Sequence, residues 1–101
     1  MFTDPFPGIK EINPMSKVDL IRAIRLDLAL EQDATAVYTA HAEASPNTLA
    51  TKVLRSIANE ERVHIGELLR LIETLDPEET KFLENGAAEV ENFKEFAENW
   101  R

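Results

Sequence analysis

The sequence contains no cysteine, only three glycines and relatively few basic residues. The absence of cysteine excludes disulfides, thiolate-bound zinc, iron–sulfur clusters and a thiol nucleophile. Any metal site must therefore use carboxylate and imidazole ligands, a set that fits iron, manganese or zinc. Eleven basic residues stand against nineteen acidic ones, and the net charge of -8 argues against nucleic acid or an anionic membrane as a partner.

Long hydrophobic runs are also missing. The first fourteen residues, MFTDPFPGIKEINP, contain two acids and three prolines, and they lack the apolar stretch of a signal peptide or a membrane span. We therefore expect a cytoplasmic protein. With 101 residues, of which 44% are hydrophobic and 30% charged, the chain suits one modest globular domain.

A long stretch without proline or glycine predicts the first helix. Ser16 is expected to be its N-cap, with Asp19 as a capping-box partner, and the helix should run to Ala44. Its apolar residues recur at helical spacing: Leu20, Ile21, Ile24, Leu28, Ala34, Val37 and Tyr38. Residues 1–15 are expected to form a separate, proline-punctuated arm whose docking side chains are Phe2, Phe6 and Ile9.

A second long helix is expected after a tight turn. Ser45-Pro46 should end the first helix and supply both the N-cap and the first-turn proline of the second. The second helix should run from about Pro46 to Leu75, where Asp76-Pro77 ends it. The two helices then form an antiparallel hairpin.

The remainder of the chain is acidic. We expect a break at Asn85-Gly86 and a shorter amphipathic helix from about Ala87 to Trp100. Glu73, Glu78, Glu79 and the later acids should form an exposed face. No segment has the alternation of a β-strand, so the predicted fold class is all-α, with the hairpin and the C-terminal helix making up residues 16–101.

Both long helices carry more apolar residues than a single contact needs. The second helix alone has eight at helical spacing: Leu49, Val53, Leu54, Ile57, Ile65, Leu68, Leu69 and Ile72. Two helices bury only one seam between them, so the surplus predicts association into a larger bundle.

A carboxylate and a histidine interrupt the apolar side of the second helix. Ile57, Glu61, His64 and Leu68 follow one another at spacings of four, three and four, as in a coiled-coil seam that ought to be buried. The i, i+3 spacing of Glu61 and His64 brings both side chains to one point. A buried, unpaired carboxylate costs several kcal/mol, so we expect a compensating partner, and a metal ion is one.

The first helix carries a matching carboxylate. Leu28, Glu31 and Tyr38 recur at spacings of three and seven, which places Glu31 near the middle of the seam. Two-metal sites in helix bundles use a glutamate from each of two helices and a Glu-x-x-His from each of two others. This chain has half of that set. A two-fold dimer would complete it, with the paired Glu61 residues bridging two metals and with Glu31 and His64 as terminal ligands.

Each of these residues also has a purely structural interpretation. Glu31 can be a solvated carboxylate, and Glu61 with His64 can be an interhelical salt bridge or hydrogen bond. Tyr38 is either a core aromatic residue or a residue that supports the ligands. His41 is expected at the surface or at a helix end. Three further acids are expected to be solvated, with an entry path for cations as the alternative: Asp33, Glu60 and Glu67.

Taken together, the motifs resemble those of the encapsulated ferritins, the ferritin-like cargo of encapsulin nanocompartments. The resemblance covers about residues 16–98. It rests on E-x6-Y in EQDATAVY, on E-x-x-H in EERVHIGE thirty residues further on, and on LDPEE at the end of the second helix. It implies half of a ferritin-like four-helix bundle that dimerisation completes, and a decameric ring of five dimers.

The resemblance also implies an activity. The family oxidises Fe(II) to Fe(III), and the mineral forms inside the encapsulin shell. Glu31, Glu61 and His64 would then bind two iron ions per dimer, with Tyr38 supporting them at the catalytic centre. The family's usual Gly-Ser-Leu-like docking tail differs from AENWR, so a trimmed tail, fusion to a shell protein and absence of a shell all stay open.

Two other functions compete with a ferroxidase. A rubrerythrin-like peroxide reductase shares the Glu and Glu-x-x-His set, although such proteins usually bring a cysteine-ligated iron that this sequence cannot form. A non-enzymatic helical assembly protein would use the same residues only as a polar network.

Overall fold

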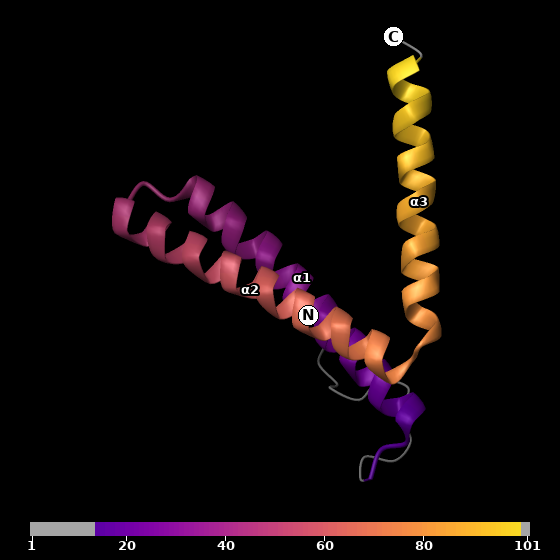
Figure 1. Ribbon diagram of the computed structural model, residues 1–101. Coiled ribbons are helices and arrows are strands. Elements are labelled where there is room, and N and C mark those ends of the chain that lie inside the picture. The colour runs from indigo at the N-terminus through magenta and orange to yellow at the C-terminus, as the bar shows by residue number, and fades with distance from the viewer. Residues whose placement is uncertain (1–13, 100–101) are drawn as a thin grey trace.

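The computed structural model describes residues 14–99, which form three helices: α1 (Lys17–Ala44), α2 (Thr48–Leu75) and α3 (Glu78–Asn99). α1 and α2 lie antiparallel and side by side, whereas α3 leaves the end of α2 and points away from the hairpin (Figure 1). The predicted all-α fold is confirmed. Most of the predicted N-terminal arm and Trp100 lie outside the described residues, so the domain boundary at residue 15 stays a prediction.

The ends of α1 follow from its capping residues. The Ser16 side chain accepts a hydrogen bond from the Asp19 backbone N–H at 3.1 Å, which satisfies one of the free donors of the first turn. At the other end Ser45 is the C-cap and has an extended backbone (φ -70°, ψ 130°), as expected for a residue that precedes proline. The predicted extent of this helix is therefore confirmed.

The start of α2 differs from the prediction. Its N-cap is Asn47 rather than Ser45, and Pro46 lies in the turn instead of in the first helical turn. The Asn47 side chain accepts a hydrogen bond from the Ala50 N–H at 2.9 Å, and asparagine is among the strongest N-cap residues. The Ser45 hydroxyl instead accepts a hydrogen bond from the Asn47 N–H at 3.2 Å, inside the turn.

The hairpin buries only a narrow seam. Among the described residues, the buried apolar side chains are Ile24, Ala42, Ala58 and Ile72. Several residues of the predicted stripes remain exposed, including Leu49 at 72% and Val53 at 49%. Val37 of the first predicted stripe is also exposed, and so are Leu30 and Leu71, which belong to neither stripe. No helix of the described chain is long and apolar enough to cross a membrane.

α3 is longer than predicted. It begins at Glu78 and continues through Asn85-Gly86, where a break was expected and does not occur. The Asp76 side chain accepts a hydrogen bond from the Glu78 N–H at 3.2 Å, which favours a helix start directly after Pro77. One glycine inside a helix costs only about 1 kcal/mol relative to alanine, and the residues on both sides favour a helix. The turn signal of Asn85-Gly86 is therefore overridden.

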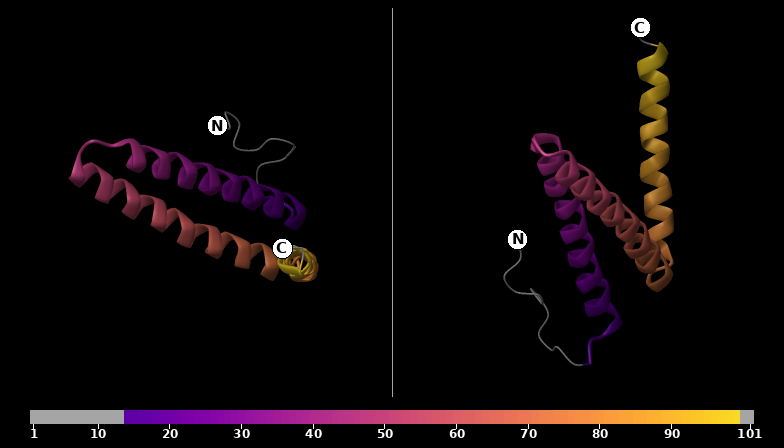
Figure 2. Two further views of the ribbon diagram at one scale, coloured as in Figure 1. Left: turned by 90° about the horizontal axis from the view of Figure 1, so that it is seen from above. Right: turned by 90° about the vertical axis from the view of Figure 1, so that its left-hand side faces the viewer.

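The first turn of α3 is fixed to the hairpin. Arg25 of α1 donates two hydrogen bonds to the Glu79 carboxylate, at 3.0 and 2.9 Å, and the Thr80 hydroxyl donates to Glu73 at 3.2 Å. Glu79 is buried, and Glu73 is only partly exposed, so the expectation that both belong to an exposed acidic face is wrong. Seen along α3 in the left view of Figure 2, this helix stands at the far end of the hairpin from the Ser45–Asn47 turn.

Candidate metal centre

Three side chains from the two hairpin helices converge at one point. Each of Glu31, Glu61 and His64 offers one ligand atom, and these atoms all lie within 4.8 Å of one another. His64 Nδ1 lies 3.4 Å from Glu31 Oε2 and 3.5 Å from Glu61 Oε2. The structure therefore brings together the three residues that the sequence pattern selects as ligands.

Helix geometry explains this convergence. Glu61 and His64 are three residues apart on α2, so their side chains are neighbours on one side of the helix. The antiparallel helices join at Ser45–Asn47, so residues that lie equally far before and after this turn are side by side. Glu31 on α1 therefore reaches the same point as Glu61 on α2. The Thr35 hydroxyl also donates a hydrogen bond to the Glu31 carbonyl at 2.8 Å, which gives this turn of α1 an additional bond.

The burial of the three side chains is uneven. The exposed fractions are 25% for Glu31, 18% for Glu61 and 48% for His64. The expectation that this side of α2 is buried is therefore met only in part at Glu61, which is half-buried, and is wrong for His64, which is exposed. The reason is that a single hairpin covers the carboxylates from one side only and leaves the imidazole at the edge.

The donor set fits a metal ion. Glu31 Oε2 is buried and has no hydrogen-bond partner among the described residues, a condition that normally costs about 1–3 kcal/mol. Ligand atoms bound to one ion at about 2.1 Å lie at most about 4.2 Å apart, so the three side chains need only small rotations to close on a cation. Two carboxylates and an imidazole suit iron, manganese or zinc. One chain supplies too few ligands for a two-metal centre.

Comparisons with known proteins place the chain in a family. Residues 23–101 match the rubrerythrin family. The chain belongs to the rubrerythrin family. The crystal structure of an encapsulated ferritin domain from Pyrococcus furiosus matches this rubrerythrin-family chain with a TM-score of 0.79 and 33% identity, covering 91% of this chain and 93% of that one. The resemblance to the encapsulated ferritins is thereby confirmed.

Two curated proteins are also similar to this rubrerythrin-family chain. A ferritin-like-encapsulin shell fusion protein of Pyrococcus furiosus is 35% identical over 81% of this chain and 24% of its own length. The encapsulin nanocompartment cargo protein EncC of Myxococcus xanthus is 38% identical over 76% of this chain and 58% of its own length. The chain thus spans about a quarter of the length of the first relative and somewhat more than half of the length of the second.

The remaining predicted residues do not belong to the cluster. Tyr38 lines a shallow pocket on α1 together with Leu30, Asp33, Ala34 and Val37. No hydrogen bond to the Tyr38 hydroxyl occurs within residues 14–99, so a supporting role for it stays a prediction. His41 is exposed in the last turn of α1, as expected. Asp33, Glu60 and Glu67 are also exposed.

One charged pair was not found from the sequence. Arg25 and Glu79 are fifty-four residues apart, and no local spacing links them. The hydrogen bonds from Arg25, reinforced by its charge, hold the pKa of Glu79 below its ordinary value, and partial burial opposes this shift. The one signal in the sequence is the acidic LDPEE segment at the end of α2, which places carboxylates at the point where the chain leaves the hairpin.

Proposed function

We propose that this protein is a ferroxidase that oxidises Fe(II) to Fe(III) at a two-iron centre shared between two chains. Glu31, Glu61 and His64 are the proposed iron ligands. The observation that carries this proposal is the convergence of these three side chains around Glu31 Oε2, a buried oxygen that accepts no hydrogen bond within residues 14–99 and lies 3.4 Å from His64 Nδ1. Membership of the rubrerythrin family, whose bundle sites use this residue set, supports iron as the metal.

A second copy supplies the missing ligands. A two-fold axis beside the open edge of the cluster brings two sets of Glu31, Glu61 and His64 together and completes the four-helix bundle. Glu61 is the most enclosed of the three side chains and would be the bridging ligand, whereas Glu31 and His64 would be terminal ligands. We further propose that these dimers assemble into a decameric ring.

The roles of the protein residues follow from charge and position. The two carboxylates of each chain are hard ligands that favour Fe(III) over Fe(II), which supplies part of the driving force. His64 binds through Nδ1, the ring nitrogen that faces the carboxylates. Two bound Fe(II) ions would each give up one electron to O2, and with two protons from solvent water the products would be two Fe(III) ions and one hydrogen peroxide. Tyr38 is proposed to support the ligands from two turns along α1.

The names of the relatives suggest where the reaction occurs. One relative is a ferritin-like domain fused to an encapsulin shell, and another is an encapsulin cargo protein. We propose that this chain likewise works inside an encapsulin compartment in the cytoplasm and supplies iron for mineral storage there.

Single alanine substitutions of Glu31, Glu61 and His64 test the ferroxidase. Each should lower the initial rate of aerobic Fe(II) oxidation, followed by ferric absorbance, about tenfold or more, and should reduce bound iron below two per dimer. Glu43→Ala is the matched control, because Glu43 is exposed and lies twelve residues beyond Glu31, roughly 18 Å along α1. Unchanged stoichiometry and rate in all three variants would refute the assignment.

A rubrerythrin-like peroxide reductase is the second candidate, because the whole matched region belongs to that family. Anaerobic addition of hydrogen peroxide to the Fe(II)-loaded protein separates the two activities. A peroxide reaction much faster than the reaction with O2 favours the reductase, whereas a faster reaction with O2 favours the ferroxidase.

A further inference from the structure

Glu31 is held in place differently from the other two proposed ligands. It reaches the cluster alone from α1, whereas Glu61 and His64 are neighbours on one side of α2. Its Oε2 atom is buried, accepts no hydrogen bond within residues 14–99 and lies 3.4 Å from His64 Nδ1. The position of this oxygen therefore depends on the backbone of α1 at Glu31.

The turn of α1 that carries Glu31 has one hydrogen bond beyond the regular helical pattern. The Thr35 hydroxyl donates to the Glu31 carbonyl at 2.8 Å, and Thr35 is half-buried. A threonine that bonds the carbonyl four residues earlier often bends the helix and makes it slightly less stable. Because the Glu31 carboxylate lies several bonds from the backbone, a small change in the axis of α1 moves the carboxylate further. The Thr35 bond thus influences where Glu31 meets α2.

Threonine is an unexpected residue at this position. Thr35 lies four residues after Glu31 and three before Tyr38, so it belongs to the seam between the helices. The antiparallel pairing of α1 and α2 places it near Ile57 and Ala58, neither of which offers a polar side chain. Threonine is also a poorer helix former than alanine, and a hydroxyl costs more to bury than a methyl group. Stability alone therefore favours an apolar residue here.

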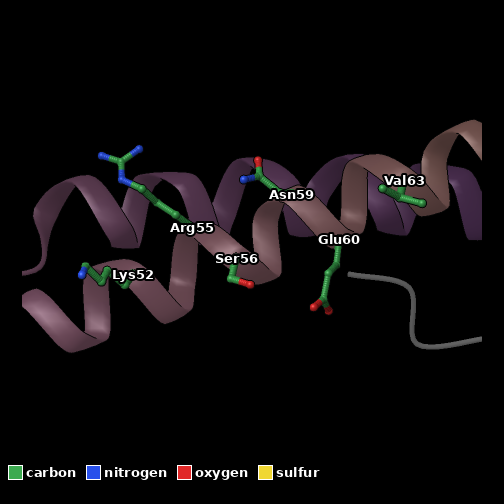
Figure 3. A pocket seen from close by; sticks show the side chains of 6 residues that line it. All are labelled: Lys52, Arg55, Ser56, Asn59, Glu60 and Val63. Atoms are coloured by element: carbon green, nitrogen blue, oxygen red, sulfur yellow. The ribbon is translucent and has the colours of Figure 1, made fainter.

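A groove on the outer side of α2 contains several polar side chains (Figure 3). Its lining residues are Lys52, Arg55, Ser56, Asn59, Glu60 and Val63. Asn59 and Glu61 lie about 200° apart around α2, so the groove and the ligand side of this helix face in different directions. Support for Glu31 within the hairpin therefore comes from α1 itself.

The same type of hydrogen bond occurs far from the cluster. The Thr74 hydroxyl donates to the Arg70 carbonyl, also at 2.8 Å. Thr74 is exposed and lies ten residues beyond His64, roughly 15 Å along α2. The bond by itself is therefore ordinary, and its place on the turn of a proposed ligand distinguishes Thr35. Thr74 consequently serves as a matched control.

We propose that Thr35 is a positioning residue for the metal centre. Its hydroxyl holds the turn of α1 at Glu31, so that the one ligand from this helix meets Glu61 and His64 in the arrangement that a cation requires. Ligand groups have to be held within about 0.5 Å of their working positions. The inference rests on the proposed function, because it takes Glu31 as a ligand. Thr35 does not touch the metal and acts only through Glu31.

Titration of the metal-free protein with Co(II), followed by visible absorption, tests this role. Thr35→Val removes the hydroxyl but keeps the shape of the side chain. It should weaken Co(II) binding about tenfold, the lower end of the effect of residues that orient a metal ligand, and should alter the absorption spectrum. Thr35→Ser keeps the hydroxyl and should restore the wild-type affinity and spectrum. Thr74→Val removes the matching bond and should bind Co(II) like the wild-type protein.

Two further measurements separate positioning from a structural role. The urea midpoint of metal-free Thr35→Val should not fall, because the Glu31 carbonyl keeps its backbone hydrogen bond. Adding Thr35→Val to Glu31→Gln should cause no further loss of Co(II) affinity, because the residue that Thr35 positions is already impaired.

Three results would overturn the role of Thr35. The first is wild-type Co(II) affinity and spectrum in Thr35→Val, and the second is an additive loss of affinity in the double variant. The third is a loss of affinity that is matched by a lower urea midpoint and is not restored in Thr35→Ser. Unchanged Co(II) binding in Glu31→Gln alone is a different result, because it would refute Glu31 as a ligand and the proposed function with it.

Discussion

At the scale of single residues, Glu31 is the position where stability and the proposed function oppose each other. Its Oε2 atom is buried without a hydrogen-bond partner in the described chain, and a second carboxylate, Glu61, lies in the same cluster. Both features destabilise the metal-free protein. A cation between the carboxylates removes both costs, which gives this pair of residues a physical reason to bind one.

The substitution Glu31→Gln separates these two effects. It keeps the shape of the side chain but removes the charge, so we expect it to stabilise the metal-free protein by about 1 kcal/mol. The measurement is urea unfolding at fixed protein concentration with a chelator present. Added Fe(II) under anaerobic conditions should raise the melting temperature of the wild-type protein, because it binds the folded state, and should raise that of the variant much less. Destabilisation by Glu31→Gln with unchanged iron-induced stabilisation would contradict this interpretation.

The convergence of Glu31, Glu61 and His64 could be predicted because it depends only on helical spacing and on the position of the turn. The i, i+3 spacing fixes Glu61 beside His64, and the hairpin turn brings Glu31 to the same level. The exposure of His64 could not be predicted, because it depends on what covers the outer side of the seam. The Arg25–Glu79 pair was missed for a related reason: it depends on how α3 meets α1, which no local pattern specifies.

At the scale of elements, the Arg25–Glu79 pair joins α3 to the hairpin. The Glu79 side chain is 12% exposed and that of Arg25 is 47% exposed, so solvent screens part of the attraction. We expect Glu79→Gln to lower the free energy of unfolding by about 1–2 kcal/mol at neutral pH, since a bidentate, charge-assisted contact is lost. Glu98→Gln on the exposed part of α3 is the control and should have no measurable effect.

The contribution of this pair should depend on pH. Arg25 lowers the pKa of Glu79 in the folded protein below the ordinary value of 4.5. As pH falls below 4.5, the unfolded chain takes up a proton at this residue before the folded chain does, so the stabilisation decreases. The difference in unfolding free energy between wild type and Glu79→Gln should be largest above this pH and shrink below it. A constant difference down to acid pH would show that the pair does not stabilise the junction.

The continuity of α3 across Asn85-Gly86 shows where sequence interpretation failed. Asn-Gly is a strong turn signal, but it outweighs helix formation only when the flanking residues disfavour a helix. A methyl group added to Gly86 would meet no atom within 4 Å, and the same holds for Gly66 in α2. Gly86→Ala should therefore raise the protection of α3 amides against hydrogen exchange by about 0.5–1 kcal/mol without changing the hairpin.

Gly66→Ala provides the matched comparison for this prediction. It should increase protection in the hairpin rather than in α3, by a similar amount. A loss of protection in α3 on Gly86→Ala would indicate that the helix needs glycine there, for example because another chain approaches closely.

At the scale of the whole molecule, the hairpin could be predicted well because three signals in the sequence agree along α1 and α2. These are the helical spacing of the apolar residues, the capping residues and the helix-breaking prolines. The sequence also predicted that this hairpin is incomplete, from the surplus of apolar residues. The exposed side chains support this: Leu30 and Val37 on α1 are 37% and 45% exposed, and Val53 and Leu71 on α2 are 49% and 43% exposed. Val53 and Leu71 are eleven residues before and seven after His64, so they share the side of α2 that carries the candidate ligand.

If two chains must meet to complete the iron centre, breaking their contact should abolish oxidation without touching a ligand. Val37→Asp introduces a charge into this apolar surface at a side chain that a single chain leaves 45% exposed, so the hairpin should still fold. We expect the variant to sediment at a lower mass than the wild-type protein and to oxidise Fe(II) at least about tenfold more slowly per chain. Ala36→Asp is the control, because the neighbouring side chain points about 100° away around α1. A Val37→Asp protein that has lost the contact at this surface but oxidises iron at the wild-type rate would show that one chain completes the centre alone, without ligands from a second copy.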